Sequence, residues 1–180
     1  MKNLFSFTIL LLSSLSTLIQ SAQVPNADTP SFYLVATSAS SPNLLPLRMP
    51  AGGGGGSASL LGSGTPALFY FYQGQLTVYD PNGNSFPYRP LINTVQGASG
   101  CGNFGALQFV QGTSTNKCAS YSSFQLQSNQ QDSQLGAELV FNYVGGFYAC
   151  NSGVEVWYKI NSSDGPSNCV PIHLYTVPAY

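Results

Sequence analysis

Few residues of this 180-residue chain could carry out acid–base or nucleophilic chemistry. His173 is the single histidine. Beyond the apolar N-terminus the carboxylates are Asp28, Asp80, Asp132, Glu138, Glu155 and Asp164. Glycoside hydrolysis needs two carboxylates at a suitable separation. Glu138 and Glu155 are the pair to consider, because both fall on predicted strands, whereas the aspartates lie before the domain or in loops where turn and capping roles explain them.

Other features of the sequence argue against a catalytic centre. The chain has no G-x-S-x-G motif, which would supply a nucleophile elbow. His173 alternates with Ile172 and Leu174, so it lies on the face of a strand opposite these apolar residues. A solvent-facing position on a strand also explains Glu138 and Glu155. We therefore predict no catalytic residues, and keep a secreted carbohydrate-active hydrolase using Glu138 and Glu155 as the alternative.

No metal or cofactor site is predicted. The four cysteines have no C-x-x-C spacing, and a single histidine is too few for the usual zinc ligand sets. The glycine run at residues 52–56 lacks the following helix and the lysine that a phosphate-binding loop requires.

The N-terminus has the three parts of a secretory signal peptide. A positive Met1-Lys2-Asn3 precedes an apolar stretch diluted by Ser and Thr, and Gln20-Ser21-Ala22 ends in a small-residue cleavage site. The densest apolar run, Phe7–Leu12, is far shorter than the roughly 20 residues of a membrane-spanning helix. We predict a signal peptide over residues 1–22, an N-terminal extension over 23–30 and one domain over 31–180, with no membrane attachment after cleavage.

The mature chain is poor in charge. Its cations are Arg48, Arg89, Lys117 and Lys159, and no basic run occurs. An electrostatic footprint for nucleic acid or for an anionic membrane is therefore missing. A surface of Ser, Thr, Asn and Gln with many Tyr and Phe suits uncharged polar partners such as polysaccharide, and it is also common among extracellular β-proteins.

The cysteines indicate an oxidising compartment. All four lie beyond the signal peptide, and their even number predicts two disulfides. Four cysteines allow three pairings. We expect Cys101–Cys118 and Cys150–Cys169, because each of these pairs closes a short loop rich in turn-forming residues. Asn161, in Asn161-Ser162-Ser163, is the only N-glycosylation acceptor.

Short runs of β-branched and aromatic residues, bounded by Gly, Pro and Asn, recur along the chain without helical periodicity. The predicted strands are Phe32–Thr37, Leu44–Arg48, Ala58–Leu61, Leu68–Tyr72, Gln75–Tyr79, Leu107–Gln111, Ser123–Gln127, Glu138–Tyr143, Phe147–Cys150, Val154–Ile160 and Ile172–Val177. They predict a single compact all-β domain. Aromatic-rich strands near residues 69, 124 and 147 form a weak internal repeat, which favours a β-trefoil over a sandwich.

The aromatic residues are too many for one buried face of each strand, so some rings must lie outside. Exposed Tyr and Trp rings stack on other planar groups at little entropic cost. Trp157 and Tyr158 are the pair that we predict to contact a ligand. A buried Trp with an outward Tyr is the commoner arrangement of such a pair.

The C-terminal half resembles a known family. Phe147-Tyr148-Ala149-Cys150-Asn151-Ser152-Gly153 and Cys169-Val170-Pro171-Ile172 carry the likeness, together with the earlier Gly74–Asp80 strand. Residues 68–177 resemble the C-terminal domain of the fungal PIR cell-wall mannoproteins and the small phialide-associated cell-wall proteins. The glutamine-containing repeats that attach PIR proteins to β-glucan are absent here, since Gln73-Gly74-Gln75 occurs once.

The resemblance implies a secreted, non-enzymatic protein of the fungal cell wall. It would contact wall polysaccharide or pack among wall proteins, with a role in conidial development or stress protection. A secreted lectin-like effector is a further alternative. It differs from a wall protein in where the product accumulates, not in any particular residue.

Overall fold

The computed structural model describes residues 23–24, 28–50, 56–83, 86–129 and 134–180. The predicted signal peptide lies outside these residues. The described chain is all-β: about half of it is strand, every strand pairing is antiparallel, and the only helical element is a 3₁₀ turn at Asn151–Gly153. Within the described ranges, no helix is long and apolar enough to cross a membrane.

Thirteen strands form one continuous sheet in the described residues. Their bounds are β1 Gln23–Val24, β2 Phe32–Thr37, β3 Leu45–Pro46, β4 Leu68–Tyr72, β5 Gln75–Val78, β6 Arg89–Gly97, β7 Gly100–Val110, β8 Ala119–Ser120, β9 Phe124–Gln127, β10 Glu138–Phe141, β11 Gly146–Cys150, β12 Glu155–Lys159 and β13 Cys169–Pro178. All-β architecture is therefore confirmed. The trefoil arrangement stays a prediction.

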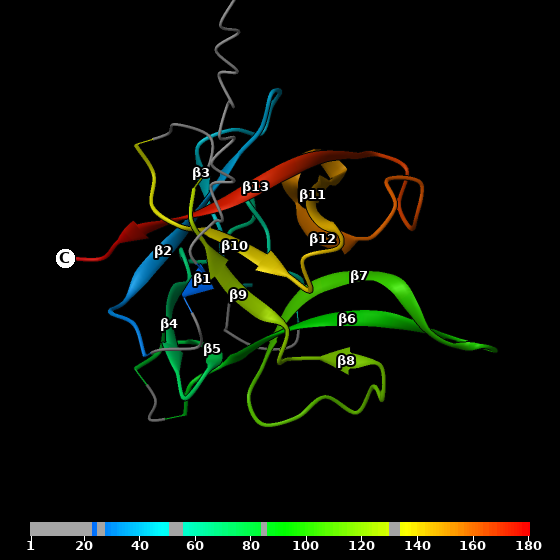
Figure 1. The fold of residues 1–180 in the computed structure, drawn as a ribbon, viewed down its shortest axis with the longest axis horizontal. Coiled ribbons are helices and arrows are strands. Elements are labelled where there is room, and N and C mark those ends of the chain that lie inside the picture. The colour runs from blue at the N-terminus through cyan, green and yellow to red at the C-terminus, as the bar shows by residue number, and fades with distance from the viewer. Residues whose placement is uncertain (1–22, 25–27, 51–55, 84–85, 130–133) are drawn as a thin grey trace, which may run out of the picture.

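The sheet curls around β13, which pairs with β2, β10 and β11 (Figure 1). One arm runs from β13 through β2 and β4 to β5, and another runs through β11, β12 and β7 to β6. The two arms meet where Val78 and Tyr88 exchange backbone hydrogen bonds of 2.9 and 2.8 Å. This contact brings the end of β5 against the start of β6, so the curled sheet encloses its own core.

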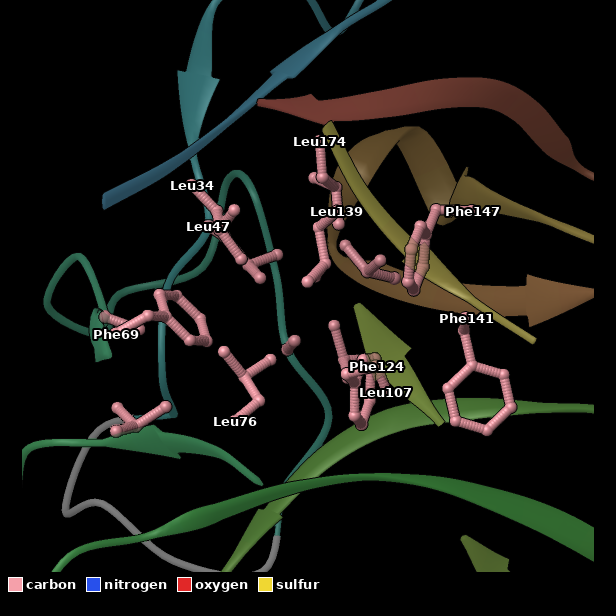
Figure 2. Packing of buried hydrophobic residues seen from close by; sticks show 14 of the residues in the cluster. Leu34, Leu47, Phe69, Leu76, Leu107, Phe124, Leu139, Phe141, Phe147 and Leu174 are labelled. Atoms are coloured by element: carbon pink, nitrogen blue, oxygen red, sulfur yellow. The ribbon is translucent and has the colours of Figure 1, made fainter. Parts of the chain in front are cut away.

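Strict alternation of side chains explains why these segments form strands. In β2, the residues Phe32, Leu34 and Ala36 are buried and their neighbours are half-buried. The same period of two recurs in β4, β9, β10 and β11. Each large apolar side chain removed from water contributes roughly 1.5–3 kcal/mol. Figure 2 shows side chains from distant strands, among them Leu34, Leu107 and Phe124, converging in this single core.

Several segments differ from the sequence-based expectation. β7 begins at Gly100 instead of Leu107, only Leu45–Pro46 of the predicted Leu44–Arg48 is strand, and β8 was not predicted. Arg89–Gly97 is a nine-residue strand that the sequence did not suggest, although it forms the longest hairpin of the described chain with β7. Ala58–Leu61, predicted as a strand, contains only an isolated bridge between Ser59 and Arg48. At the N-terminus, Gln23 and Val24 of the predicted extension pair with β9.

Both predicted disulfides are confirmed. Cys101–Cys118 has a Cα–Cα distance of 5.3 Å, and Cys150–Cys169 has one of 4.0 Å. Cys150 and Cys169 lie directly opposite each other on β11 and β13, and Cys150 is fully buried. This bridge therefore ties β11 to the strand around which the sheet is organised.

Replacing both Cys150 and Cys169 by Ala should lower the free energy of unfolding by about 3 kcal/mol, because the unfolded chain regains the freedom of a loop of about 20 residues. Urea denaturation followed by circular dichroism measures this loss. A Cys101→Ala/Cys118→Ala variant is the matched control, since the sequence separations are 17 and 19 residues. The two losses should be similar, and a loss below about 1 kcal/mol in both would contradict the expectation.

Candidate functional site

A groove opens on the outer surface where β10 and β11 diverge. β11 pairs with Cys169–Ile172 of β13, whereas β10 pairs with Leu174 and Tyr175. Both strands lie along the same edge of β13, because β2 occupies the other edge from His173 onward. The two strands therefore separate as they leave β13, and the space between them is a cavity of about 220 Å³. Its polar and aromatic lining includes Gln127, Glu138, Tyr143, Tyr148 and His173.

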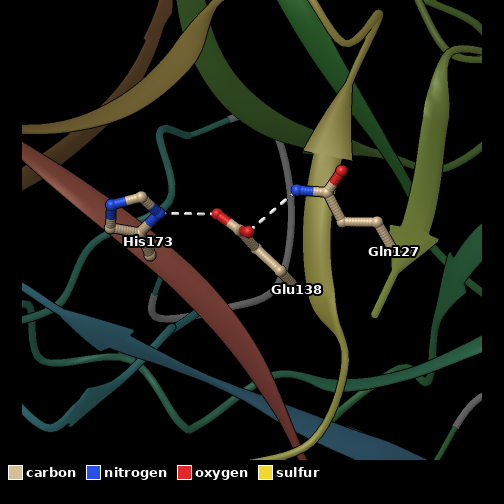
Figure 3. A network of polar contacts seen from close by, with 3 residues as sticks. All are labelled: Gln127, Glu138 and His173. Atoms are coloured by element: carbon tan, nitrogen blue, oxygen red, sulfur yellow. Dashed lines mark hydrogen bonds and ion pairs between the residues drawn. The ribbon is translucent and has the colours of Figure 1, made fainter. Parts of the chain in front are cut away.

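A chain of three polar side chains forms one wall of the groove. His173 Nδ1 lies 2.6 Å from Glu138 Oε1, and Gln127 Nε2 donates a 2.8 Å hydrogen bond to Glu138 Oε2. Figure 3 shows the carboxylate held between the imidazole and the amide. The His173 side chain is 47% exposed and the Glu138 side chain only 16%. Glu138 is thus fixed in the wall, while His173 stands at the rim.

The held carboxylate keeps capacity for a ligand. Each carboxylate oxygen has about two acceptor positions, and the two contacts described use one on each oxygen. A ligand hydroxyl entering the groove could therefore donate to Glu138 without displacing Gln127 or His173. At the other end of the groove, Tyr143 Oη contacts the amide oxygen of Gln125.

Tyr175 lies beside this wall and is fully buried. Its ring is nearly parallel to that of His173, with centroids 6.1 Å apart and an interplanar angle of 19°. Burial, and next the nearby carboxylate of Glu138, raise the pKa of Tyr175 to about 12. The Tyr175 hydroxyl has no hydrogen-bond partner among the described residues.

Tyr148 supplies an aromatic surface on the β11 side of the groove. The ammonium of Lys159 lies 5.1 Å from the centre of the Tyr148 ring, and it also donates to the carbonyl of Pro166. Lys159 is completely buried, and this burial lowers the pKa of its ammonium group, with Asp164 opposing the effect. The lysine thus fastens the β12–β13 connection to the outer face of the sheet and supports the Tyr148 ring.

Trp157 and Tyr158, the predicted ligand-binding pair, point in opposite directions. Trp157 faces outward: its Nε1 donates a 2.8 Å hydrogen bond to Glu155, and its ring lies 6.3 Å from that of Phe104. Tyr158 is only 3% exposed and packs edge-on against Phe141 at 4.7 Å. Little of the Tyr158 ring is therefore open to solvent, although Tyr158 is among the residues that line a second cavity of about 380 Å³. The role of the pair in ligand binding stays a prediction. The alternation of β12 places one of two successive residues in the core.

Glu138 and Glu155 are not brought together. Glu155 pairs with Cys150, which pairs with Cys169 at the start of β13, whereas Glu138 pairs with Tyr175. The six residue steps from Cys169 to Tyr175 along β13 span about 20 Å at roughly 3.3 Å per residue. Paired carboxylates of glycosidases are about 5–9.5 Å apart. Glu155 instead accepts the hydrogen bond from Trp157.

The other predicted residues lie where their types suggest. Asn161 is exposed, and its backbone and side-chain nitrogens both donate to Asp164 Oδ2, at 3.1 and 3.2 Å. This turn would present a glycan to solvent, although glycosylation itself stays a prediction. Of the residues described, no three His, Cys, Asp or Glu side chains cluster as a metal site would require.

Gln127 and Tyr148 line the groove, and the sequence did not predict either of them as a site residue. A local signal exists for the first: in Phe124-Gln125-Leu126-Gln127 the two amides fall on one face of a strand. No sequence pattern indicates that Gln127 and Tyr148 share a groove, because the groove forms only when β13 pairs with both β10 and β11.

Comparisons with known proteins do not identify a relative. No family model matches the chain, and neither a curated protein nor a solved structure does. The resemblance to fungal cell-wall proteins therefore stays a prediction, and the chemistry of the groove is the principal guide to function.

Alkaline pH should destabilise the protein through Tyr175. The unfolded chain loses the phenolic proton near pH 10, while the folded chain keeps it until about pH 12. Stability that is fully present below pH 10 should therefore fall as the pH rises towards 12, by on the order of 2 kcal/mol.

A Tyr175→Phe variant, which also removes the unpartnered hydroxyl, should be at least as stable as the wild type at pH 7 and should lose less stability between pH 10 and 12. Urea denaturation across this pH range measures both effects. Tyr72→Phe, at an exposed position, is the control. An alkaline loss that is the same in Tyr175→Phe and in the wild type would contradict the assignment.

Proposed function

We propose that this protein is a secreted, non-enzymatic component of the fungal cell wall, which binds uncharged wall polysaccharide in the groove between β10 and β11. The observation that carries the proposal is the fixed array of Gln127, Glu138 and His173 facing the same groove as Tyr148. A row of preorganised polar groups can accept and donate hydrogen bonds to sugar hydroxyls. An aromatic ring provides the apolar surface on which a sugar face can stack.

The charge of the groove supports a neutral ligand. Among the described residues of the lining, Glu138 is the one carboxylate and His173 is the one residue that can become cationic. The two are in contact at 2.6 Å, and Gln127 donates to the same carboxylate. An acidic polymer or nucleic acid would meet no lysine or arginine among these residues. Two disulfides and a charge-poor surface are consistent with an extracellular location.

The hydrolase alternative receives less support from this geometry. Glu155 lies far from Glu138, so Glu138 is the one carboxylate among the described residues that line the groove, and two neighbours already contact it. Binding without bond cleavage needs only the array that is present. A lectin-like effector would use the same groove, and comparing the cell-wall fraction with the culture medium distinguishes it from a wall protein.

Retention of the purified mature protein on insoluble β-glucan and on chitin tests the proposal. The wild type should be retained above an albumin control at moderate salt. Tyr148→Ala should weaken retention several-fold to about tenfold, the change that a stacking contact of roughly 0.5–1.5 kcal/mol produces. Glu138→Gln should also weaken it, because an amide replaces a charged acceptor of nearly the same shape.

Phe86→Ala is the matched control, because it removes an aromatic ring that is 74% exposed and does not line the groove. Its retention should equal that of the wild type. Equal retention of the wild type and of the two groove variants would exclude the groove as the binding site, and no retention of the wild type on either polymer would reject polysaccharide binding altogether.

A further inference from the structure

A second group of aromatic side chains lies on the outer face of the β4–β5 hairpin. Tyr70 and Tyr72 alternate with buried residues on β4, so both point outward about 7 Å apart along the strand. Tyr79 follows β5, and its ring centroid lies 4.5 Å from that of Tyr70. We call these three residues the tyrosine platform. Tyr72 is 55% exposed and Tyr79 is 46% exposed.

The three phenols share one surface. Tyr70 is in ring contact with Tyr79 and lies two positions from Tyr72 on β4, and burial together with these two neighbours raises the pKa of Tyr70. Each exposed ring has one side-chain contact: Ser31 Oγ lies 3.5 Å from Tyr79 Oη, and Gln73 Nε2 donates to Tyr72 Oη at 3.3 Å. A tyrosine side chain has only two torsion angles, so it loses little conformational entropy when a ligand stacks on its ring.

The charged side chains near the tyrosine platform are few. Asp28 accepts a 2.7 Å hydrogen bond from the backbone N–H of Gln73. Arg89 donates to the side chain of Gln75 and lies 4.4 Å from the ring centre of Tyr121. The platform itself offers ring faces and hydroxyls, and none of its three side chains carries a charge near neutral pH. This chemistry fits an uncharged polyhydroxyl chain better than a charged peptide or a lipid headgroup.

The tyrosine platform and the groove are separate surfaces. In Figure 1, β4 and β5 lie at the lower left, whereas β11 and β12 lie above and to the right of the centre. In the sheet, β2 and β13 separate β4 from β10 and β11. No platform residue lines the groove. A single short stretch of polysaccharide bound in the groove would therefore leave the platform available to another chain.

We infer that the tyrosine platform is a second polysaccharide contact, and that the protein bridges two neutral glycan chains. This inference rests on the proposed function, since it takes the groove as the first contact. Two contacts on one rigid domain make attachment to an insoluble polymer bivalent, which can exceed the affinity of either contact by about 10²–10⁴-fold. The consequence is non-covalent cross-linking without the glutamine-containing repeats that the sequence lacks.

Light scattering from mixtures of the protein with a long, soluble β-glucan tests bridging directly. Scattering should increase as wild-type protein is added, because the protein cross-links glucan chains. It should fall again at excess protein, because each protein molecule then binds one glucan chain only. A Tyr72→Ala/Tyr79→Ala variant should give no increase in scattering. It should still be retained on insoluble β-glucan through the groove, but at least about tenfold more weakly.

Tyr72→Phe/Tyr79→Phe is the matched control, because it keeps the rings and should keep the scattering response. Circular dichroism checks that both variants are folded. A scattering response in the Ala variant equal to that of the wild type would overturn the inference, and so would a wild type that is retained on insoluble glucan without scattering.

Two further outcomes distinguish the causes of failure. Wild-type protein that is not retained on insoluble glucan overturns both the inference and the proposed function. A second copy of this protein could occupy the platform instead of a glycan, and sedimentation velocity without glucan detects such a dimer. A dimer that the Tyr72→Ala/Tyr79→Ala variant abolishes would make the platform a self-association surface and would overturn the inference.

Discussion

The structure depends on how β13 shares its backbone hydrogen bonds. One edge pairs with β2, while the other passes from β11 to β10 within a few residues. This change of partner links the two arms of the sheet, and their far ends then meet at Val78 and Tyr88. It also forces β10 and β11 apart, so the same constraint that encloses the core produces the groove.

The groove and the core lie on opposite faces of the same strands. Leu139 and Phe147 point into the core, while Glu138 and Tyr148 point outward from adjacent positions. Because the inward residues pack tightly, the outward residues are held in fixed positions at little additional cost in conformational entropy. The Cys150–Cys169 bridge secures β11 against β13 at the other end of this region. A binding surface of this kind is preorganised rather than formed around its ligand.

Low charge has a consistent role throughout the domain. The ionisable groups near the two aromatic surfaces have polar or aromatic neighbours: Glu138 contacts Gln127 and His173, Asp28 contacts Gln73, and Lys159 contacts Pro166 and the Tyr148 ring. Ring faces, hydroxyls and amides make up most of what these surfaces present. The proposed binding of neutral polysaccharide depends on this low charge.

The sequence by itself determined the all-β class and most strands, because alternation is a local property. It allowed three disulfide pairings, and the expected one is confirmed by the tertiary structure, which brings each pair of cysteines together. It missed β6, where Pro90 and Asn93 interrupt the β-branched pattern and pairing with β7 supplies the stability. It identified Glu138 and Glu155 as residues of interest but could not show that they are far apart, nor that Trp157 rather than Tyr158 faces outward. Tertiary structure alone joined Glu138 to Gln127, His173 and Tyr148, since these residues come from four strands whose neighbours are fixed only by long-range pairing around β13.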